Sequence, residues 1–466
     1  MEFLKKNYLG EIRAAAMRVD ITDIGEQGYK GFFIKDSEIV DRLEAKINLL
    51  TADDAKFIWI SLDECSIRSC SAKEIITSIS QSLKIPTENI MMACVHTHSG
   101  HNHNINLELL VSKLVKGVES LMKKLVVVSH IRQTIGSIKH VVNRRVDLPQ
   151  DLGGYCVMFN HQCNVSEDDL KLDATEQIDQ FLKKSEGEKH IPLETKYCLG
   201  NHADLRIHMW ELLDSNKKPV LSVVRVNAHP VIVSQSRVGA KISADYVRVL
   251  EKLIESDLGC TCSLFNGAFG DTRPLTNNYS FEDRERFAQR YYNAIKKSQS
   301  TIAPITNLTW LQFKDVGMSL RKEAPRSLEG LKKLREKIQF NINNKIGSNK
   351  RNYDLLELVE GFLLDDKKQP SAIVYNEEIE KGFACYQMNG WVIGPMKILA
   401  LPGEPLTDFA AAIEKDSGVL PIGLANGYLS YLPASQTIKE GGYEANQCVL
   451  SEEGIETLIS LNKYFI

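Results

Sequence analysis

The 466-residue sequence contains no run of 18 apolar residues, so no membrane-spanning helix is expected. It also lacks an excess of charge of one sign, because 57 basic residues are balanced by 60 acidic ones and leave a net charge of −3. Nucleic acid is therefore not a favoured partner, and no stable membrane anchor is expected. Residues 1–18 are interrupted by charged side chains and lack the apolar stretch of a secretion signal.

Cysteine is present but without the spacing of a disulfide framework, because ten cysteines are scattered over the whole chain. Without a secretion signal we expect them to be reduced thiols, which predicts a cytoplasmic protein. Cys260 and Cys262 form the one close pair, but the single residue between them is too short a spacing for a zinc knuckle. We interpret them as part of a buried strand.

Strand-like and helix-like apolar patterns alternate along much of the chain. Short continuous apolar runs predict strands over residues 57–62, 90–95, 219–226, 261–265 and 396–401. Apolar residues at helical spacing predict helices over residues 72–83, 107–125, 246–254 and 409–414. This alternation predicts an α/β protein whose sheets are covered by helices.

Residues 321–369 combine a helical pattern with a long polar run. Leu328, Leu331, Leu334 and Ile338 fall in phase on one helical face. We therefore predict a helical insertion at about 321–369. It either caps a site or presents a solvated face, which is the commoner role of a charge-rich helix.

Four of the chain's 11 histidines fall between His96 and His103, directly after a predicted strand. In open α/β sheets, ligand sites gather beyond the carboxyl ends of strands. His96 and His98 lie two residues apart, so on an extended segment their rings share one side. Such a pair suits metal binding or acid–base chemistry. The alternative is a polar loop whose histidines are incidental.

Two further strand ends carry candidate ligands. His229 follows the strand at 219–226, and Pro230 fixes the loop there, although a lone histidine is more often structural. Glu404 follows the strand at 396–401, near a helix start where a carboxylate is also favoured for structural reasons. Two histidines and one glutamate from three strand ends match a catalytic zinc site with an open position: His96, His229 and Glu404.

At these same residues the sequence resembles the neutral, non-lysosomal ceramidases, which are zinc-dependent amidases that hydrolyse the N-acyl bond of ceramide. The resemblance rests on short strings in the family's order: Arg18-Val19-Asp20-Ile21-Thr22, Gly28-Tyr29, His96-Thr97-His98-Ser99-Gly100, Asn143-Arg144, Asn227-Ala228-His229-Pro230, Phe265-Asn266, Gly270-Asp271, Pro402-Gly403-Glu404, Asn426-Gly427-Tyr428-Leu429-Ser430-Tyr431 and Tyr443-Glu444. It implies mixed sheets covered by helices, in a single catalytic domain over residues 1–466.

The resemblance also implies roles for individual residues. The residues implied to hold Zn2+ are His96, His229, Glu404 and Tyr431. The residues implied to line the substrate amide are His98, Arg144 and Tyr443. Metal-activated water would then cleave the amide. Arg144 or a tyrosine hydroxyl would stabilise the oxyanion, and His98 would carry a proton to the leaving amine.

The sequence departs from the family at the active-site serine, because Arg273 stands at that position. A second guanidinium near the centre favours an anionic substrate or transition state. His101 and His103, which the family's loop lacks, either bind a second metal or contact the substrate. The family's carboxyl-terminal immunoglobulin-like domain is expected to be missing, so access to membrane ceramide is expected to be poor.

These observations favour a zinc-dependent hydrolase that cleaves an amide, or less readily an ester, in a substrate smaller or more polar than ceramide. The partner is thus a small-molecule amide or lipid-like compound. Two alternatives stay open. One is a true ceramidase, which predicts a deep apolar channel for the sphingoid base and the acyl chain. The other is a catalytically degenerate homologue that binds a ligand, which the missing serine suggests.

Overall fold

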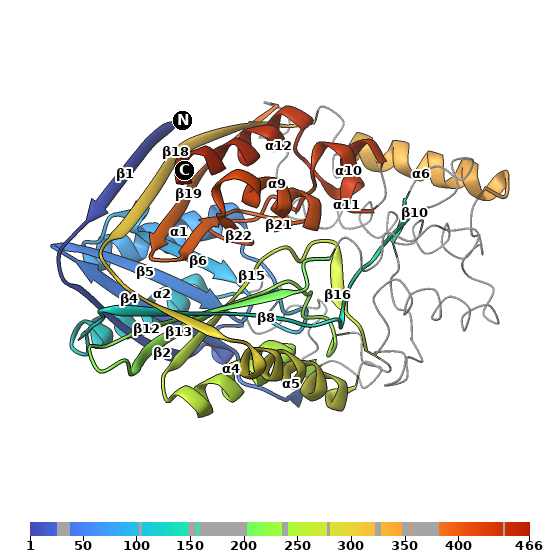
Figure 1. Ribbon diagram of the computed structural model, residues 1–466. Coiled ribbons are helices and arrows are strands. Elements are labelled where there is room, and N and C mark those ends of the chain that lie inside the picture. Colours follow the sequence, from blue (N-terminus) through green and yellow to red (C-terminus); the bar gives the residue numbers. More distant parts are fainter. Residues whose placement is uncertain are drawn as a thin grey trace.

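A computed structural model describes residues 1–25, 38–101, 105–147, 155–157, 203–234, 241–276, 280–321, 328–346, 356, 382–440 and 443–466. Within these ranges the chain forms three five-stranded sheets with helices packed against them (Figure 1). The predicted α/β class, with mixed sheets covered by helices, is confirmed. None of the described helices is both long and apolar enough to cross a membrane.

The first sheet has the strand order β6–β5–β4–β2–β7. Its strands are β2 (Ile12–Asp20), β4 (Glu44–Ala52), β5 (Ala55–Leu62), β6 (Ile90–Cys94) and β7 (Val126–Val127). β5 and β6 are parallel and are connected through α1 (Ser69–Leu83), whereas the other neighbours are antiparallel. The apolar faces of α1 and of α2 (Leu107–Met122) cover one face of this sheet, with Ile75, Ile79 and Leu114 fully buried.

The second sheet has the order β15–β13–β12–β8–β17. Its strands are β8 (His130–Ser137), β12 (Arg206–Leu213), β13 (Pro219–Val226), β15 (Thr261–Asn266) and β17 (Ser300–Pro304). β13 and β15 are parallel and are connected through α4 (Asp245–Leu258). α4 and α5 (Phe281–Lys297) pack on this sheet (Figure 1), and α5 begins with a capping box between Ser280 and Asp283.

The third sheet has the order β1–β18–β19–β20–β22. Its strands are β1 (Glu2–Tyr8), β18 (Leu308–Ser319), β19 (Phe383–Ile393), β20 (Met396–Ala400) and β22 (Leu420–Ile422). β20 and β22 are parallel and are connected through α9 (Thr407–Ser417). α9 and α12 (Glu452–Ile459) cover one face of this sheet, where Phe409 and Leu458 are fully buried.

The remaining faces of the three sheets meet in one central core. Each sheet contributes tryptophan to it, and Trp59, Trp210, Trp310 and Trp391 are all buried. The rings of Trp59 and Trp391 stack with centroids 4.7 Å apart, although they come from different sheets. Large aromatic surfaces buried in this way bind the three sheets to one another.

The other described strands and the short helices lie outside the three five-stranded sheets. The short strands are β3 (Glu38–Ile39), β9 (Val141–Asn143), β10 (Arg145–Asp147), β11 (Tyr155–Val157), β14 (Lys241–Ile242), β16 (Thr272–Pro274), β21 (Glu404–Pro405) and β23 (Tyr431–Leu432). The short helices are η1 (Thr22–Ile24), η2 (Thr87–Asn89), α10 (Ser435–Glu440), α11 (Tyr443–Gln447) and η5 (Ser460–Phe465).

The predicted elements agree closely with those observed, with small shifts at their ends. The helix predicted over 107–125 ends at Met122, because the last turn gives way to the strand β7. α6 (Leu328–Asn343) lies within the predicted insertion, whose residues 322–327, 347–355 and 357–369 fall outside the described ranges. The insertion's role, and the single domain over 1–466, stay predictions.

The carboxyl ends of the parallel strands from all three sheets come together. Asn266, at the end of β15, donates a side-chain hydrogen bond to the carbonyl of Val95 (2.5 Å). The carbonyl of Asn266 accepts one from the N–H of Gly423 (2.8 Å), just after β22. Ala93 of β6 forms an isolated bridge with Ala425, three residues after the end of β22. These contacts bring the loops that follow the strands to one place.

Candidate metal centre

Each sheet supplies one residue of the predicted triad. His96 follows β6 in the first sheet, and His229 follows β13 in the second. Glu404 follows β20 in the third sheet and forms the start of β21. All three therefore lie beyond the carboxyl end of a strand that takes part in a parallel pair, where α/β folds usually place their ligand sites.

The three side chains converge on one point. Nε2 of His96 lies 3.4 Å from Oε2 of Glu404, and Nε2 of His229 lies 3.2 Å from the same oxygen. No more than 3 % of any of these residues is exposed. The three ligand atoms lie within 4.8 Å of one another, which is close enough to share a single ion.

Hydrogen bonds on the far side of each ligand decide which atom faces the centre. Nδ1 of His96 donates to the carbonyl of Cys65 (2.7 Å). Nδ1 of His229 donates to the carbonyls of Phe269 (2.6 Å) and Thr272 (2.9 Å). In their neutral forms both imidazoles therefore present Nε2 with its lone pair, which is the arrangement that carbonyl partners impose on metal-binding histidines.

Glu404 is oriented in the same way, because the hydroxyl of Tyr428 donates to its Oε1 (2.7 Å) and leaves Oε2 toward the histidines. The backbone of His96 has a φ of +66°, an uncommon conformation for a residue with a β-carbon. It is held there by its N–H, which donates to the carbonyl of Glu64 (2.9 Å).

The atoms at the centre fit a divalent cation. Nε2 of His229 and Oε2 of Glu404 are buried and make no hydrogen bond within the described residues. Buried polar atoms without a partner are rare, and here they face each other beside a third ligand atom. Two imidazoles and one carboxylate with a further open position form the usual donor set of a catalytic zinc site.

Charges around the centre favour the states that bind a cation. Burial opposes charge on Glu404, but His96 and His229 outweigh it and hold the pKa of this carboxyl well below its usual range. Burial, followed by the nearby guanidinium of Arg144, lowers the pKa of His229 to about 4. Burial also opposes charge on His96, but Cys65 and Glu404 raise its pKa, so a proton and a metal cation compete for this ring.

Tyr431 and Arg144 lie beside the triad. Tyr431 on β23 is the direct register partner of Glu404 on β21, which places the two residues side by side. The Tyr431 hydroxyl accepts a hydrogen bond from an Nη of Arg144 (3.0 Å). Arg144 is buried and is fixed further by Glu444, whose Oε1 accepts from its Nε (2.8 Å). The role of Tyr431 as a fourth ligand stays a prediction.

His98 lies at the open side of the centre. Its Nε2 is 3.2 Å from Nε2 of His96, and its ring centroid is 5.9 Å from that of His229. The residue is exposed to solvent, so it can exchange protons. Desolvation by the surrounding protein, followed by His96 and His229, holds the pKa of His98 well below its usual range.

Two other predicted residues are placed less completely. Arg273 is buried on β16, opposite Val142, and directly follows Thr272, whose carbonyl orients His229. The Thr272 hydroxyl donates to the carbonyl of Asn227 (2.7 Å), so it serves the fold. Tyr443 begins α11, and its side chain lies outside the described part of the structure.

His101 is occupied by protein partners, which argues against a second metal at this residue. The Glu64 carboxylate contacts Nδ1 of His101 and also accepts from its backbone N–H (2.9 Å). Nε2 of His101 donates to the carbonyl of Thr22 (2.9 Å). Burial opposes charge on His101, but Glu64 outweighs it and raises the pKa of the ring. His103 and the string Gly28-Tyr29 lie outside the described residues.

Several residues of the centre were not predicted individually. Tyr428 and Glu444 belong to strings that carried the resemblance, yet only their neighbours were assigned roles. Cys65 was noted as one of ten scattered thiols, although its carbonyl orients His96. Glu64 was not singled out either. Glu64 stands two residues after the apolar run of β5, and a carboxylate at such a position is a sequence pattern that could have indicated it.

The sequence matches no protein-family model and no curated protein. Solved structures do resemble the fold. The neutral ceramidase from Pseudomonas aeruginosa superposes with a TM-score of 0.61 at 15% sequence identity, covering 98% of this chain and 73% of that one. A ceramidase complexed with C2 gives the same TM-score and identity and is covered over 74% of its length. The chain therefore has a neutral-ceramidase-like fold.

Proposed function

We propose that this chain is a zinc-dependent hydrolase that cleaves an amide bond, or less readily an ester bond. The observation that carries the proposal is the buried convergence of His96, His229 and Glu404, each from a different sheet. The ceramidase-like fold adds support, because the solved structures it resembles are named as ceramidases. Zinc bound there would polarise the carbonyl and lower the pKa of a bound water.

The residues around the triad have chemistry that suits this reaction. His98 is exposed beside the triad, with its Nε2 3.2 Å from that of His96, so it is placed to take a proton and deliver it to the leaving amine. Arg144 carries a fixed positive charge and polarises the Tyr431 hydroxyl, to which it donates. Together they would stabilise negative charge that develops on the carbonyl oxygen. Tyr443 is proposed to contact the same amide.

We further propose that the substrate is smaller or more polar than ceramide. Arg273 takes the place where the resemblance leads one to expect a serine, and it is buried on β16 one residue after Thr272, whose carbonyl orients His229. Guanidinium groups bind carboxylate and phosphate oxygens through paired hydrogen bonds. An N-acyl compound that carries an anionic group therefore fits better than a neutral lipid amide.

The second candidate function is hydrolysis of ceramide itself, which is favoured by the similarity of the fold to two ceramidase structures. The two candidates differ in the substrate and share the metal centre. A panel of N-acyl amides separates them if it contains short-chain ceramide, neutral short amides and amides with a carboxylate. If ceramide is the one substrate in the panel that is hydrolysed, with release of its fatty acid, the result would favour the second candidate.

The test of the metal-dependent reaction is metal analysis of the purified protein beside the variant His229→Ala. We expect about one zinc per wild-type chain, and loss of both zinc and turnover in the variant. Arg132→Met, which breaks an ion pair with Glu211 on the second sheet, is the matched control and should keep its zinc. A wild-type protein that binds no zinc after loading would contradict the proposal. Stoichiometric zinc without turnover on the whole panel would favour a ligand-binding homologue.

A further inference from the structure

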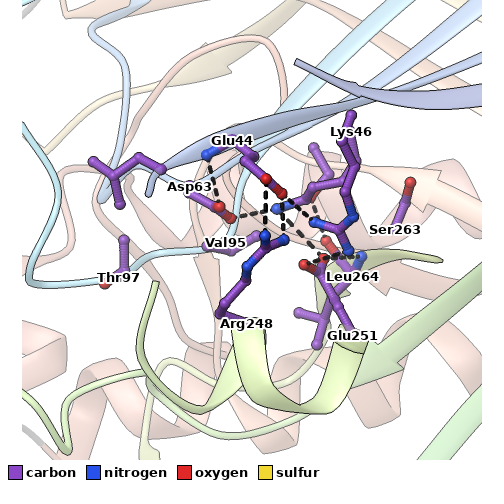
Figure 2. Close-up of polar contacts among 12 residues, drawn as sticks. Glu44, Lys46, Asp63, Val95, Thr97, Arg248, Glu251, Ser263 and Leu264 are labelled. Carbon is purple, nitrogen blue, oxygen red and sulfur yellow. Dashed lines mark hydrogen bonds and ion pairs between the residues drawn. The ribbon is translucent and has the colours of Figure 1, made fainter. Parts of the chain in front are cut away.

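Figure 2 shows a network of buried charges drawn together with Val95 and Thr97, the two neighbours of His96 in the sequence. We define this buried charge network as Arg18, Glu44, Lys46, Asp63, Arg248 and Glu251. Figure 2 shows Lys46 at its middle, where its ammonium contacts the carboxylate of Asp63 and lies 3.3 Å from Oε1 of Glu251. The guanidinium of Arg18 contacts Glu251 (3.1 Å) and Glu44 (2.6 Å), and Arg248 pairs with Glu44 (2.8 Å).

Stability alone does not account for this arrangement. The side chains of Lys46, Asp63 and Glu251 have no exposed surface at all. Removing three charges from water is costly, and well-packed apolar side chains of similar volume usually serve a core equally well or better. A buried ionic group of this kind is best explained by a specific geometry that apolar packing would not fix.

One arm of the network leads to His96. Asp63 follows β5, and its carboxylate accepts from the N–H of Glu44 (2.9 Å) while its own N–H donates to the Glu44 carbonyl (3.0 Å). The next two residues, Glu64 and Cys65, carry the carbonyls that accept from the N–H and from Nδ1 of His96. The position of Asp63 therefore sets the two groups that hold His96 in its left-handed conformation.

The other arm leads to His229. Glu251 lies on α4, and the first turn of this helix supports the loop that carries His229. The Asp245 carboxylate accepts from the N–H of Val233 (2.7 Å). The Tyr246 hydroxyl donates to the carbonyl of Ala228 (2.5 Å), the residue before His229. Displacing α4 would therefore displace His229 as well.

We propose that Lys46 is a positioning residue for the metal centre. Its ammonium bridges Asp63 and Glu251, and so it fixes the His96 loop relative to the helix that supports His229. Lys46 acts through these groups and touches neither ligand. The inference rests on the proposed function, because it assumes that the centre binds a metal.

The test measures metal affinity separately from fold stability. In Lys46→Met, chelator competition should show zinc binding weakened about tenfold, the low end of the loss caused by removing a direct partner of a ligand, because Lys46 acts one step further from His96. The visible spectrum of the Co2+-loaded variant should differ from that of the wild type, because the ligand geometry changes. Asp63→Asn, which keeps the shape of the side chain, should weaken zinc binding in the same direction and serves if Lys46→Met does not fold.

The double variant Lys46→Met with Asp63→Asn separates positioning from stability, because the asparagine amide oxygen can still accept from the N–H of Glu44. It removes the buried pair together and so should regain much of the melting temperature that Lys46→Met loses. Its zinc affinity should stay as low as that of the single variant. Recovery of both quantities together would show a merely structural role and overturn the inference.

Two further outcomes distinguish this inference from the proposed function. If Lys46→Met and Asp63→Asn bind zinc within twofold of the wild type and give its Co2+ spectrum, the inference is wrong and the proposed function stands. Equal weakening in the control Arg132→Met would also overturn it, because that ion pair joins β8 to β12 and is no part of the buried charge network. A wild-type chain that binds neither Zn2+ nor Co2+ overturns the proposed function itself.

Discussion

Single hydrogen bonds decide which atoms of the candidate metal centre are free to bind. Tyr428 illustrates this, because its hydroxyl donates to Oε1 of Glu404 and thereby turns Oε2 toward His96 and His229. Tyr428→Phe removes that donor without changing the ring that packs beside it. Oε1 then loses its partner, and the carboxylate is free to rotate away from the histidines.

We expect Tyr428→Phe to weaken zinc binding about tenfold, in the range seen for partners of metal ligands. The free energy of unfolding should fall by about 1.5 to 3 kcal/mol, since a hydrogen bond to a buried, charged carboxylate is lost. Chelator competition and urea unfolding measure the two effects. Tyr8→Phe on β1 is the control and should leave zinc binding unchanged. Unaltered affinity in Tyr428→Phe would show that Glu404 is held by other groups.

Residue type and position predicted the candidate ligands better than their supporting partners. His96, His229 and Glu404 stand directly after apolar runs, so the sequence suggested that they meet, and the structure brings their ligand atoms within 4.8 Å. Cys65 and Tyr428 act through contacts that join distant segments, and Cys65 acts through a backbone carbonyl that every residue has. No local pattern reveals such a contact before the chain is folded.

Among the strands, those whose sequences are continuous apolar runs were predicted from the sequence. β5, β13 and β20 each belong to a parallel pair that is covered on both faces. The strands that have only antiparallel neighbours were not predicted, because polar residues, some of them buried, interrupt their patterns. On β4, Lys46 and Asn48 are fully buried, and Asn48 pairs with Ser263 of the second sheet. Only the tertiary partner explains a polar residue at such a position.

The carboxylate of Asp204, just before β12, is expected to make the free energy of unfolding depend on pH. The Asp204 carboxylate accepts from Nε of Arg206 (2.8 Å) and lies 3.4 Å from an Nη of Arg225. Burial opposes its charge, but these two guanidinium groups outweigh burial and lower the pKa of Asp204 to about 2. A lowered carboxyl pKa contributes stability above the unfolded value near 4, and this contribution is lost as the pH falls toward 2.

Asp204→Asn should therefore reduce the free energy of unfolding by about 2 kcal/mol at pH 7, given 1.36 kcal/mol for each pKa unit. The difference from the wild type should shrink as the pH is lowered from 4 toward 2. Urea unfolding at a series of pH values measures it, with the exposed Glu2→Gln as the control. A difference that stays constant with pH would show that Asp204 contributes through packing alone.

At the scale of the whole molecule, the candidate centre lies where three separately covered sheets meet. Each sheet has its own helices, and the three share the core around Trp59, Trp310 and Trp391. The alternation of strands and helices predicted covered sheets, but the arrangement of three sheets around one core depends on packing between segments hundreds of residues apart. Because each sheet ends in one candidate ligand, a bound cation would link all three directly.

Zinc binding should therefore stabilise the fold as a whole. A ligand that binds only the folded chain adds RT ln(1 + [L]/Kd), which is about 2.7 kcal/mol when free zinc is 100 times its dissociation constant. The melting temperature should rise with zinc concentration in the wild type and in Arg132→Met, and it should not rise in His229→Ala or Glu404→Gln. Calorimetry at several zinc concentrations measures this dependence. Glu404→Gln keeps the shape of the side chain and loses only its charge. An equal rise of the melting temperature in this variant would therefore show that the stabilising zinc binds elsewhere and not at the triad.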